Sequence, residues 1–202
     1  MPRPEEDQTT PTAYDDVTLE SLGAHMFFGE VTEETSYAAC EFILKSNLFY
    51  EHSKPLTMFF NTCGGECSEG FAVIDLMETS RMPISTVGIG QIASMGVLLL
   101  SAGTPGLRTL TTNSEVMAHQ FSSTLYGKQH ELIATTLGLK QLEDKFYKHF
   151  LRHSKLTKRQ IKDILFSTTD RYLTPSECKK YGLIDKIVES STLPAAKRWK
   201  PS

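Results

Sequence analysis

A serine lies between small residues at position 94, in the segment Gly-Gln-Ile-Ala-Ser-Met-Gly at 90–96. The segment follows a run typical of a buried strand and opens a short apolar helix at 94–102, so we expect Ser94 at a strand-to-helix junction. The first backbone N–H groups of a helix have no partner within it and favour negative charge. This arrangement suits a serine nucleophile whose developing oxyanion is stabilised by main-chain donors.

A serine hydroxyl is a weak nucleophile without a base, so the second requirement is a histidine that can reach it. Of the six histidines, only His119 ends an apolar strand-like run, at 115–119. Asp170 lies in a short connection between two helical segments and is the candidate that orients the imidazole. We predict loops or exposed helix faces for the other histidines, which are His25, His52, His130, His149 and His153.

Each of these residues also has an ordinary structural explanation. A serine at a helix start is often a cap, a buried histidine is often a satisfied core residue, and a loop aspartate is usually a solvated turn. The glycine pair in Asn-Thr-Cys-Gly-Gly at 61–65 permits a close backbone approach to a ligand, and a tight turn without a ligand explains it equally well.

Metal and phosphate chemistry find little support in the spacing of the polar residues. Cys63 and Cys67 are four residues apart, but no second pair of cysteines or histidines completes a four-ligand zinc set at the usual spacing. The chain has no Gly-x-x-x-x-Gly-Lys-Ser/Thr motif, so any ATP hydrolysis must come from a partner. We expect no metal and no cofactor.

The elements that position these residues alternate between helix and strand, which predicts an α/β fold with a parallel sheet. Helical spacing appears at 33–47, at 71–81 and, longest, at 128–153, and strand-like runs at 56–60, 84–89, 115–119 and 183–188. Thr174, Pro175 and Glu177 form a capping box, and Gly182 ends that helix. The long helix should project, and we expect Phe146 and Phe150 on its apolar stripe to support assembly.

Composition narrows the class of protein. With 202 residues, of which 40% are hydrophobic, the chain is long enough for one domain, expected at 23–190 between a mobile arm at 1–22 and a flexible tail at 191–202. A net charge of −3 gives no electrostatic case for nucleic acid, and no apolar stretch is long enough to span a membrane. Four cysteines form no disulfide framework, so we expect a cytoplasmic protein.

In order and spacing, these segments resemble the proteolytic subunit of the Clp protease family over about 27–188. The resemblance rests on Phe-Gly-Glu-Val at 28–31, on the segments 61–65 and 90–96, on Asn-Ser-Glu-Val-Met-Ala-His-Gln at 113–120, and on Tyr-Leu-Thr-Pro-Ser-Glu at 172–177 with Tyr-Gly-Leu-Ile-Asp at 181–185. Phe121 stands where proline is usual, and Thr168 and Thr169 stand where the family has an acidic residue and an arginine.

The resemblance implies a crotonase-like β/α spiral whose long helix forms a protruding handle. It implies a serine endopeptidase in which Ser94 attacks the scissile carbonyl, His119 is the base, Asp170 fixes its tautomer, and the N–H groups of Gly65 and Met95 form the oxyanion hole. It also implies two stacked heptameric rings, a tetradecamer, fed with unfolded polypeptide by an AAA+ unfoldase of the Clp type.

Three other functions compete with this interpretation. A crotonase-like enzyme acting on acyl-thioesters would use the glycine pair without the three polar residues, and an inactive ring subunit would lose members of the triad, all of which are present. A prohead or signal-peptide-type peptidase pairs serine with lysine, and the strand at 115–120 offers a histidine instead.

Overall fold

The computed structural model describes residues 18–49, 54–121 and 126–188. The expected tail at 191–202 lies outside these residues, as does the expected arm apart from 18–22, where Glu20–Leu22 form one turn of 3-10 helix. The predicted domain limits therefore stay predictions. No helix in the described ranges is both long and apolar enough to cross a membrane.

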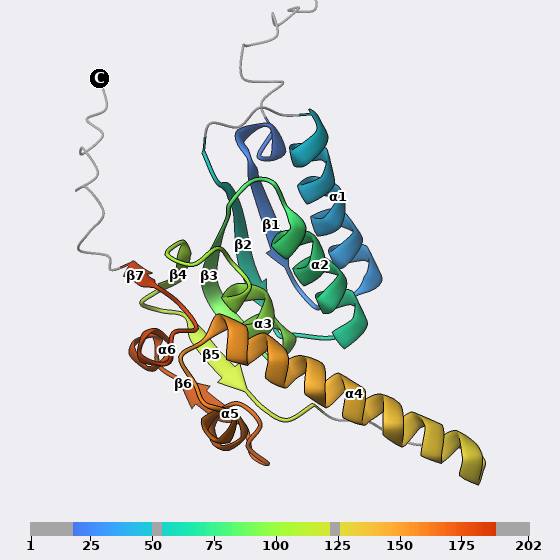
Figure 1. Cartoon of the computed structure of the whole chain (residues 1–202). Coiled ribbons are helices and arrows are strands. Elements are labelled where there is room, and N and C mark those ends of the chain that lie inside the picture. The colour runs from blue at the N-terminus through green and yellow to red at the C-terminus, as the bar shows by residue number, and fades with distance from the viewer. Residues whose placement is uncertain (1–17, 50–53, 122–125, 189–202) are drawn as a thin grey trace, which may run out of the picture.

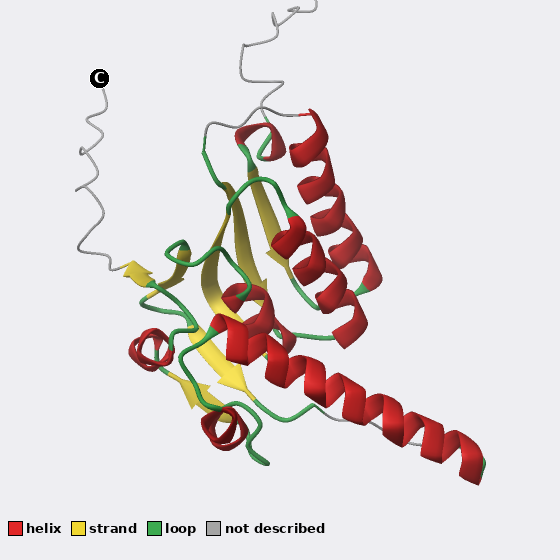
Figure 2. Ribbon diagram, in the orientation of Figure 1, coloured by secondary structure: helices red, strands yellow, loops and turns green. Residues whose placement is uncertain are grey.

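A mostly parallel sheet forms the centre of the chain (Figures 1 and 2). Its strand order is β1-β2-β3-β4-β7, and β5 and β6 extend it beyond the end of β3. β5 is parallel to β3, whereas β6 is antiparallel to β5. The strands are β1 (Ala24–Phe28), β2 (Leu56–Thr62), β3 (Ile84–Ala93), β4 (Arg108–Thr111), β5 (Glu115–Ala118), β6 (Arg171–Leu173) and β7 (Lys186–Val188).

β3 changes its neighbour along its length, which splits the sheet into two parts. Its first half pairs with β4 opposite Thr86, and its last residues pair with β5, where Ala93 lies opposite Met117. Between these halves Gly90 has a φ of 62°, and the side chain of Asn61 on β2 accepts a hydrogen bond from Gln91 N–H at 3.0 Å. The bend carries the end of β3 away from β4 and toward β5.

Two helices, α1 (Glu33–Phe49) and α2 (Cys67–Thr79), lie side by side over one face of β1–β3 (Figure 1). α3 (Met95–Ser101) follows β3 directly, and α4 (Gln129–His153) runs from the body outward, as Figure 2 shows. The short helices α5 (Lys158–Ile164) and α6 (Pro175–Tyr181) accompany β5 and β6. The arrangement is a mixed α/β fold, as the sequence predicts.

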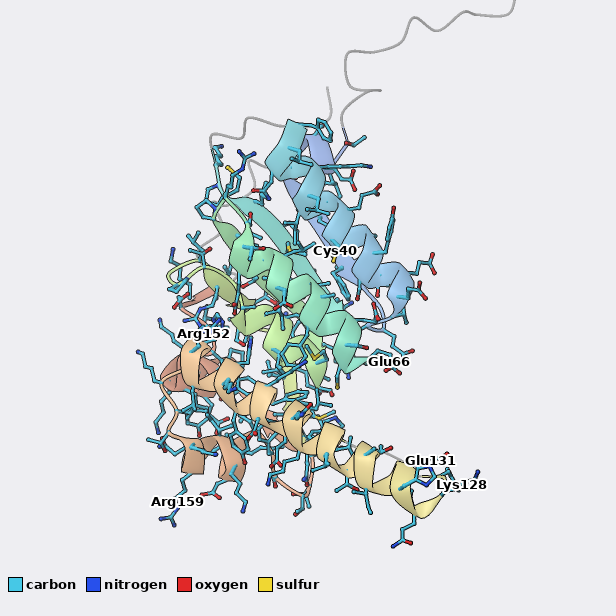
Figure 3. All side chains as sticks on the ribbon, turned by 45° about the vertical axis from the view of Figure 1, so that its right-hand side comes forward. Cys40, Glu66, Lys128, Glu131, Arg152 and Arg159 are labelled. Carbon is cyan, nitrogen blue, oxygen red and sulfur yellow. The ribbon has the colours of Figure 1, made fainter. Side chains whose placement is uncertain are left out.

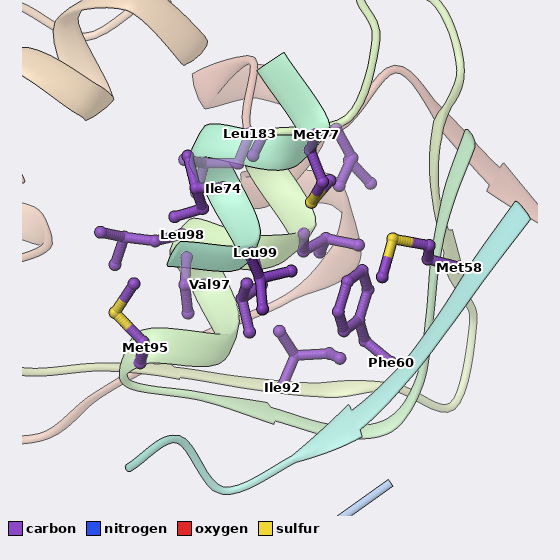
Figure 4. Close-up of a cluster of buried hydrophobic side chains, with 14 of the residues drawn as sticks. Met58, Phe60, Ile74, Met77, Ile92, Met95, Val97, Leu98, Leu99 and Leu183 are labelled. Atoms are coloured by element: carbon purple, nitrogen blue, oxygen red, sulfur yellow. The ribbon is translucent and has the colours of Figure 1, made fainter. Parts of the chain in front are cut away.

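The core surrounds α3, all seven residues of which are buried. Figure 4 shows Val97, Leu98 and Leu99 between side chains from the sheet and from α2. A helix that is apolar on all sides has no solvent face, so it is held from every direction. Its neighbours in this cluster include Met58, Phe60, Ile74, Met77, Ile92 and Leu183.

Most predicted elements are confirmed, and the capping box of α6 is present, with Thr174 accepting from Glu177 N–H and Gly182 in the left-handed conformation. The sequence analysis missed β1, β4, α5 and β6, and the strand expected at 183–188 begins only at Lys186. The missed strands have three to five residues, too few for a clear alternation of polar and apolar side chains.

Two expectations for α4 are wrong because its second half belongs to the core of the chain. Phe146 is 4% exposed and its ring packs against those of Phe71, Phe121 and Phe166. A charge at Phe146, or at the equally buried Phe150, would therefore disturb folding rather than a surface between chains. The exposed apolar residues of α4 are Ile133 and Leu137 in its first half and Leu151 near its end.

The histidines of this second half are also not on an exposed face. His149 is 6% exposed, and burial lowers its pKa to about 3, helped by the neighbouring His153. The side chain of His153 is 9% exposed and contacts Glu78 of α2. The periodicity argument failed here because α4 contacts both α3 and α2, so its buried face is wider than its stripe of leucines and phenylalanines indicates.

An ion pair between Arg108 and Asp185 joins β4 to the segment just before β7. Nη2 and Nε of the guanidinium donate to the two carboxylate oxygens at 2.8 and 2.9 Å. Burial opposes ionisation of Asp185, but hydrogen bonds from the side chain and main chain of Arg108 and from Gly106 outweigh it and lower the pKa of the carboxyl. Arg108 Nη1 also donates to the carbonyl oxygen of His153 at 2.6 Å.

We expect Asp185→Asn to lower the free energy of unfolding by about 3 kcal/mol, because it leaves a nearly buried guanidinium without its counter-charge. Since the folded pKa is depressed, this contribution is present above about pH 4 and is lost in the wild type as the pH falls through the folded pKa. Urea titrations at pH 7 and at lower pH measure both effects.

The matched control is Asp163→Asn, which removes the partner of Arg159 in an exposed pair at 3.8 Å on α5. It should change the free energy of unfolding by less than about 0.5 kcal/mol. Equal effects of the two substitutions, or a difference between Asp185→Asn and wild type that does not shrink in acid, would contradict the role given to the Arg108–Asp185 pair.

Candidate active site

Ser94 occupies a strained turn between β3 and α3. Its φ of 53° and ψ of −120° are unusual for a residue with a side chain, and no other non-glycine residue in the described ranges has a positive φ. Its N–H donates to Met117 O at 2.9 Å, and its carbonyl oxygen accepts from Val97 N–H at 3.0 Å. Strain of this kind persists only where the surroundings fix the backbone from both sides.

Gly64 makes room for this turn. A Cβ atom on Gly64 would lie 2.6 Å from Ser94 Cβ, 2.8 Å from Ala93 O and 3.0 Å from Met95 N. Gly64 also has a φ of 92°, which side chains rarely adopt. The first of the two glycines after β2 therefore permits contact between the end of β2 and the turn that holds Ser94.

His119 reaches Ser94 because of the register between β3 and β5. The two strands are parallel and Ala93 lies opposite Met117, so the residues that follow them emerge at the same edge of the sheet. His119 Nε2 lies 2.9 Å from Ser94 Oγ, within hydrogen-bond distance. The sequence analysis placed His119 at a strand end, and the structure brings it to Ser94.

Asp170 reaches the other side of the imidazole through β6. β6 is antiparallel to β5 and places Arg171 opposite Ala118, so Asp170 comes next to His119. Its Oδ1 lies 3.4 Å from His119 Nδ1, longer than the 2.7–2.9 Å typical of charge-assisted hydrogen bonds. The Asp170 side chain is 56% exposed, and such contacts often shorten when substrate covers the site.

Gly65 and Met95 have main-chain N–H groups that regular structure leaves free. The bridge between Gly65 and Val31 uses Gly64 O and Glu66 N–H, and so does not use the N–H of Gly65. Met95 is the first residue of α3, where an N–H has no acceptor within the helix. Of the two donors that the resemblance implies, Met95 follows Ser94 directly, and Gly65 follows Gly64, which packs against the Ser94 turn.

An apolar pocket opens beside Ser94 and His119. Its walls come from α2, α3, α4 and the segment around α5, and apart from Ser94 and His119 the sequence analysis assigned none of these residues to the active site. Burial, followed by the charge of Glu66, raises the pKa of the Cys67 thiol in this wall, so Cys67 is a poor nucleophile. The lining includes Cys67, Val97, Leu98, Phe121, Phe146 and Phe166.

Phe121 explains part of this shape. It stacks on Phe146 with ring centroids 5.6 Å apart and an angle of 15° between the planes. Glycines on the other side let α3 approach closely, since a Cβ on Gly96 would lie 2.6 Å from Thr62 Cγ2. The small residues around Ser94 could be recognised in the sequence. The aromatic wall of the pocket could not be predicted, because it depends on contacts between segments that are distant in the sequence.

In a comparison with protein-family models, residues 16–191 match the family described as Clp protease. The matched region includes every residue of the site, all described strands and all described helices. It covers well over half of the chain, which is sufficient to assign the family.

We expect Gly64→Ala to slow the reaction of Ser94 with a fluorophosphonate probe by about 100-fold or more, because the new methyl group displaces the nucleophile. The rate of labelling, measured by mass spectrometry of the peptide that contains Ser94, checks this. Gly106→Ala is the matched control, since Gly106 has a similar φ of 90° but open space around its Cβ position. Equal labelling of the two variants would show that Gly64 does not position Ser94.

Proposed function

The chain belongs to the Clp protease family, a family of peptidases, and we propose that it is a serine endopeptidase whose triad is Ser94, His119 and Asp170. The observation that carries the proposal is the 2.9 Å contact between Ser94 Oγ and His119 Nε2 at a strained strand-to-helix turn. Such turns expose the nucleophile beside the free N–H groups at the start of the following helix, and these groups can stabilise the oxyanion that forms.

In the proposed mechanism, the Ser94 hydroxyl donates its hydrogen bond to His119 Nε2 in the resting site, which leaves Nδ1–H directed at Asp170. Ser94 Oγ attacks the scissile carbonyl carbon while His119 takes the proton. The carbonyl oxygen becomes an oxyanion that accepts from the N–H groups of Gly65 and Met95. His119 then gives the proton to the leaving amine. Water attacks the resulting acyl-enzyme while His119 takes a proton from it, and His119 returns that proton to Ser94 Oγ as the acid product leaves.

Asp170 stabilises the imidazolium that forms in each step and keeps the ring in the tautomer that accepts from Ser94. Its separation of 3.4 Å from His119 and its exposure indicate a resting geometry that tightens when substrate excludes water. The apolar lining of the pocket beside Ser94 supports cleavage next to an apolar side chain, because a polar one would lose its hydrogen bonds there.

We also propose the assembly and the partners that the family resemblance implies: heptameric rings stacked as a tetradecamer, a Clp-type AAA+ unfoldase, unfolded polypeptide as substrate, and a cytoplasmic location. The crotonase-like spiral and the role of α4 as a handle are part of this proposal. Support comes from apolar side chains that the single chain leaves exposed. They are Met26 and Phe28 on β1, Tyr37, Leu44, Leu48 and Phe49 on α1, and Ile133 and Leu137 on α4.

Ser94→Ala should reduce cleavage of a fluorogenic peptide by about 10⁴-fold or more while the assembly stays intact, since members of a triad act as a unit. Ser68→Ala, an exposed serine of α2, is the control and should keep wild-type turnover. Cleavage by the Ser94 variant at the wild-type rate, or fluorophosphonate labelling at a different serine, would contradict the assignment of Ser94 as the nucleophile.

The double substitution Ile133→Glu with Leu137→Glu should split the assembly into smaller species without unfolding the chain, because these apolar side chains on α4 would be covered in the proposed contact between rings. Sedimentation velocity measures the assembly, and circular dichroism measures the helix content. Thr135→Glu with Gln141→Glu adds the same charge at exposed polar positions of α4 and should leave the assembly intact. A wild-type sedimentation coefficient for the first variant would contradict the proposed role of α4.

A further inference from the structure

A second cluster of titratable side chains lies away from Ser94, where α2 and α4 end. Glu78 belongs to the last turn of α2, and His149 and His153 belong to the last part of α4. Figure 3 labels their neighbour Arg152 at the end of α4 that joins the body. α2 begins at Cys67 in the wall of the pocket beside Ser94, so the two sites lie at opposite ends of the same helix.

The three side chains converge on one point. Glu78, His149 and His153 each offer one ligand atom, and these atoms all lie within 4.8 Å of one another. The two histidines are four residues apart on one helix face, with ring centroids separated by 4.5 Å. That spacing is the one by which helices present two imidazoles to a zinc ion. His153 Nε2 already lies 2.8 Å from Glu78 Oε1.

The distances fit an ion after a small adjustment. With zinc–ligand bonds of about 2.0–2.1 Å, tetrahedral ligand atoms lie about 3.3–3.4 Å apart. The present limit of 4.8 Å therefore has to shrink by about 1.5 Å at most, which we expect side-chain rotation to supply. Two imidazoles and one carboxylate, with a fourth position for water, form a ligand set that zinc commonly takes.

Ser101, at the end of α3, fixes the proton on His149. The hydroxyl of Ser101 has one proton, and Leu98 O, 3.0 Å away, can only accept it. With the Ser101 proton assigned to Leu98 O, we assign His149 Nε2–H as the donor to Ser101 Oγ at 2.9 Å. The other nitrogen of the neutral ring, Nδ1, keeps its lone pair. Histidines that bind metals are usually held in this way, by donating their second N–H to a neighbouring oxygen.

We propose that Glu78, His149 and His153 bind one zinc ion, which joins α2 to α4. Water reaches the fourth position from the surface pocket that Glu78, His149 and Arg152 line together with Asp75, Lys145 and Lys148. Arg152 is the competitor of the ion, because its guanidinium pairs with Glu78. It is 66% exposed and can turn to solvent when the ion binds.

The sequence analysis expected no metal because the spacing of the cysteines and histidines completes no four-ligand set, whereas the proposed site combines two histidines of one helix with a glutamate of another. It uses no residue of the proposed triad, so it stands independently of peptidase activity. An ion here would hold the base of α4 against the end of α2, next to the hydroxyl of Ser101.

The test uses the purified full-length chain in its own assembly, stripped with a chelator and titrated with zinc against a chromophoric zinc indicator. We expect one tightly bound ion per chain. Glu78→Gln and His153→Gln should each raise the dissociation constant by about 100-fold or more. The control His130→Gln, an exposed histidine at the start of α4, should leave it unchanged.

Arg152→Ala separates a zinc site from a network of hydrogen bonds. Removing the competitor should lower the dissociation constant about 10-fold, since Glu78 is then free for the ion. Anomalous diffraction at the zinc edge should place the ion between Glu78, His149 and His153. The proposal fails if folded wild-type chain retains no zinc at micromolar concentration, if the anomalous peak lies elsewhere, or if Glu78→Gln and His153→Gln bind as tightly as wild type.

Discussion

The contact between Gly64 and the Ser94 turn is the constraint on which the rest of the structure depends. Two parallel strands end side by side, and the chain leaves both ends at once, so their first loop residues compete for the same space. The conflict is resolved by removing a side chain, since any Cβ on Gly64 would overlap Ser94 and Ala93. Thr62 then stabilises this turn, because its hydroxyl accepts from Gly64 N–H at 3.1 Å. The strain at Ser94 is thus sustained by two strands that cannot move apart without breaking the sheet.

The burial of α3 follows from the same constraint. A helix that starts at this junction points into the space between the sheet and α2, and all its residues are apolar or small enough to be covered there. Because the helix is rigid, its two ends are coupled: Ser94 precedes the first turn, and Ser101 contacts His149 at the last. Arg108 adds a second connection, since it binds Asp185 and the carbonyl oxygens of His153 and Ser101. A polar side chain with three partners in the core is costly to disturb.

The sequence was informative where local chemistry decides the structure. Ser94 and His119 were predicted together because both follow apolar runs, and parallel strands deliver their carboxyl ends to one edge. The position of Asp170 depends on β6, a strand of three residues that pairs only with β5 among the described strands, and no local pattern predicts such a pairing. His149 shows the opposite failure, since its burial comes from packing against distant segments, including Ser101 of α3, and not from its place in the stripe of α4. Contacts of this kind arise only when distant segments pack, so periodicity misses them.

The two halves of α4 have different surroundings, and this difference connects the exposed half of the helix to the pocket beside Ser94. The first half exposes Ile133 and Leu137 and contacts little of the body, whereas the second half is embedded through Phe146 and Phe150. Phe146 is a wall of the pocket beside Ser94 and also packs on Phe121 and Phe166, which are walls of that pocket too. Protein interiors are packed too densely for one aromatic ring to shift alone. A rotation of α4 about its base must therefore change the shape of the pocket, so whatever holds the exposed half of the helix also holds the surface against which a substrate side chain would lie.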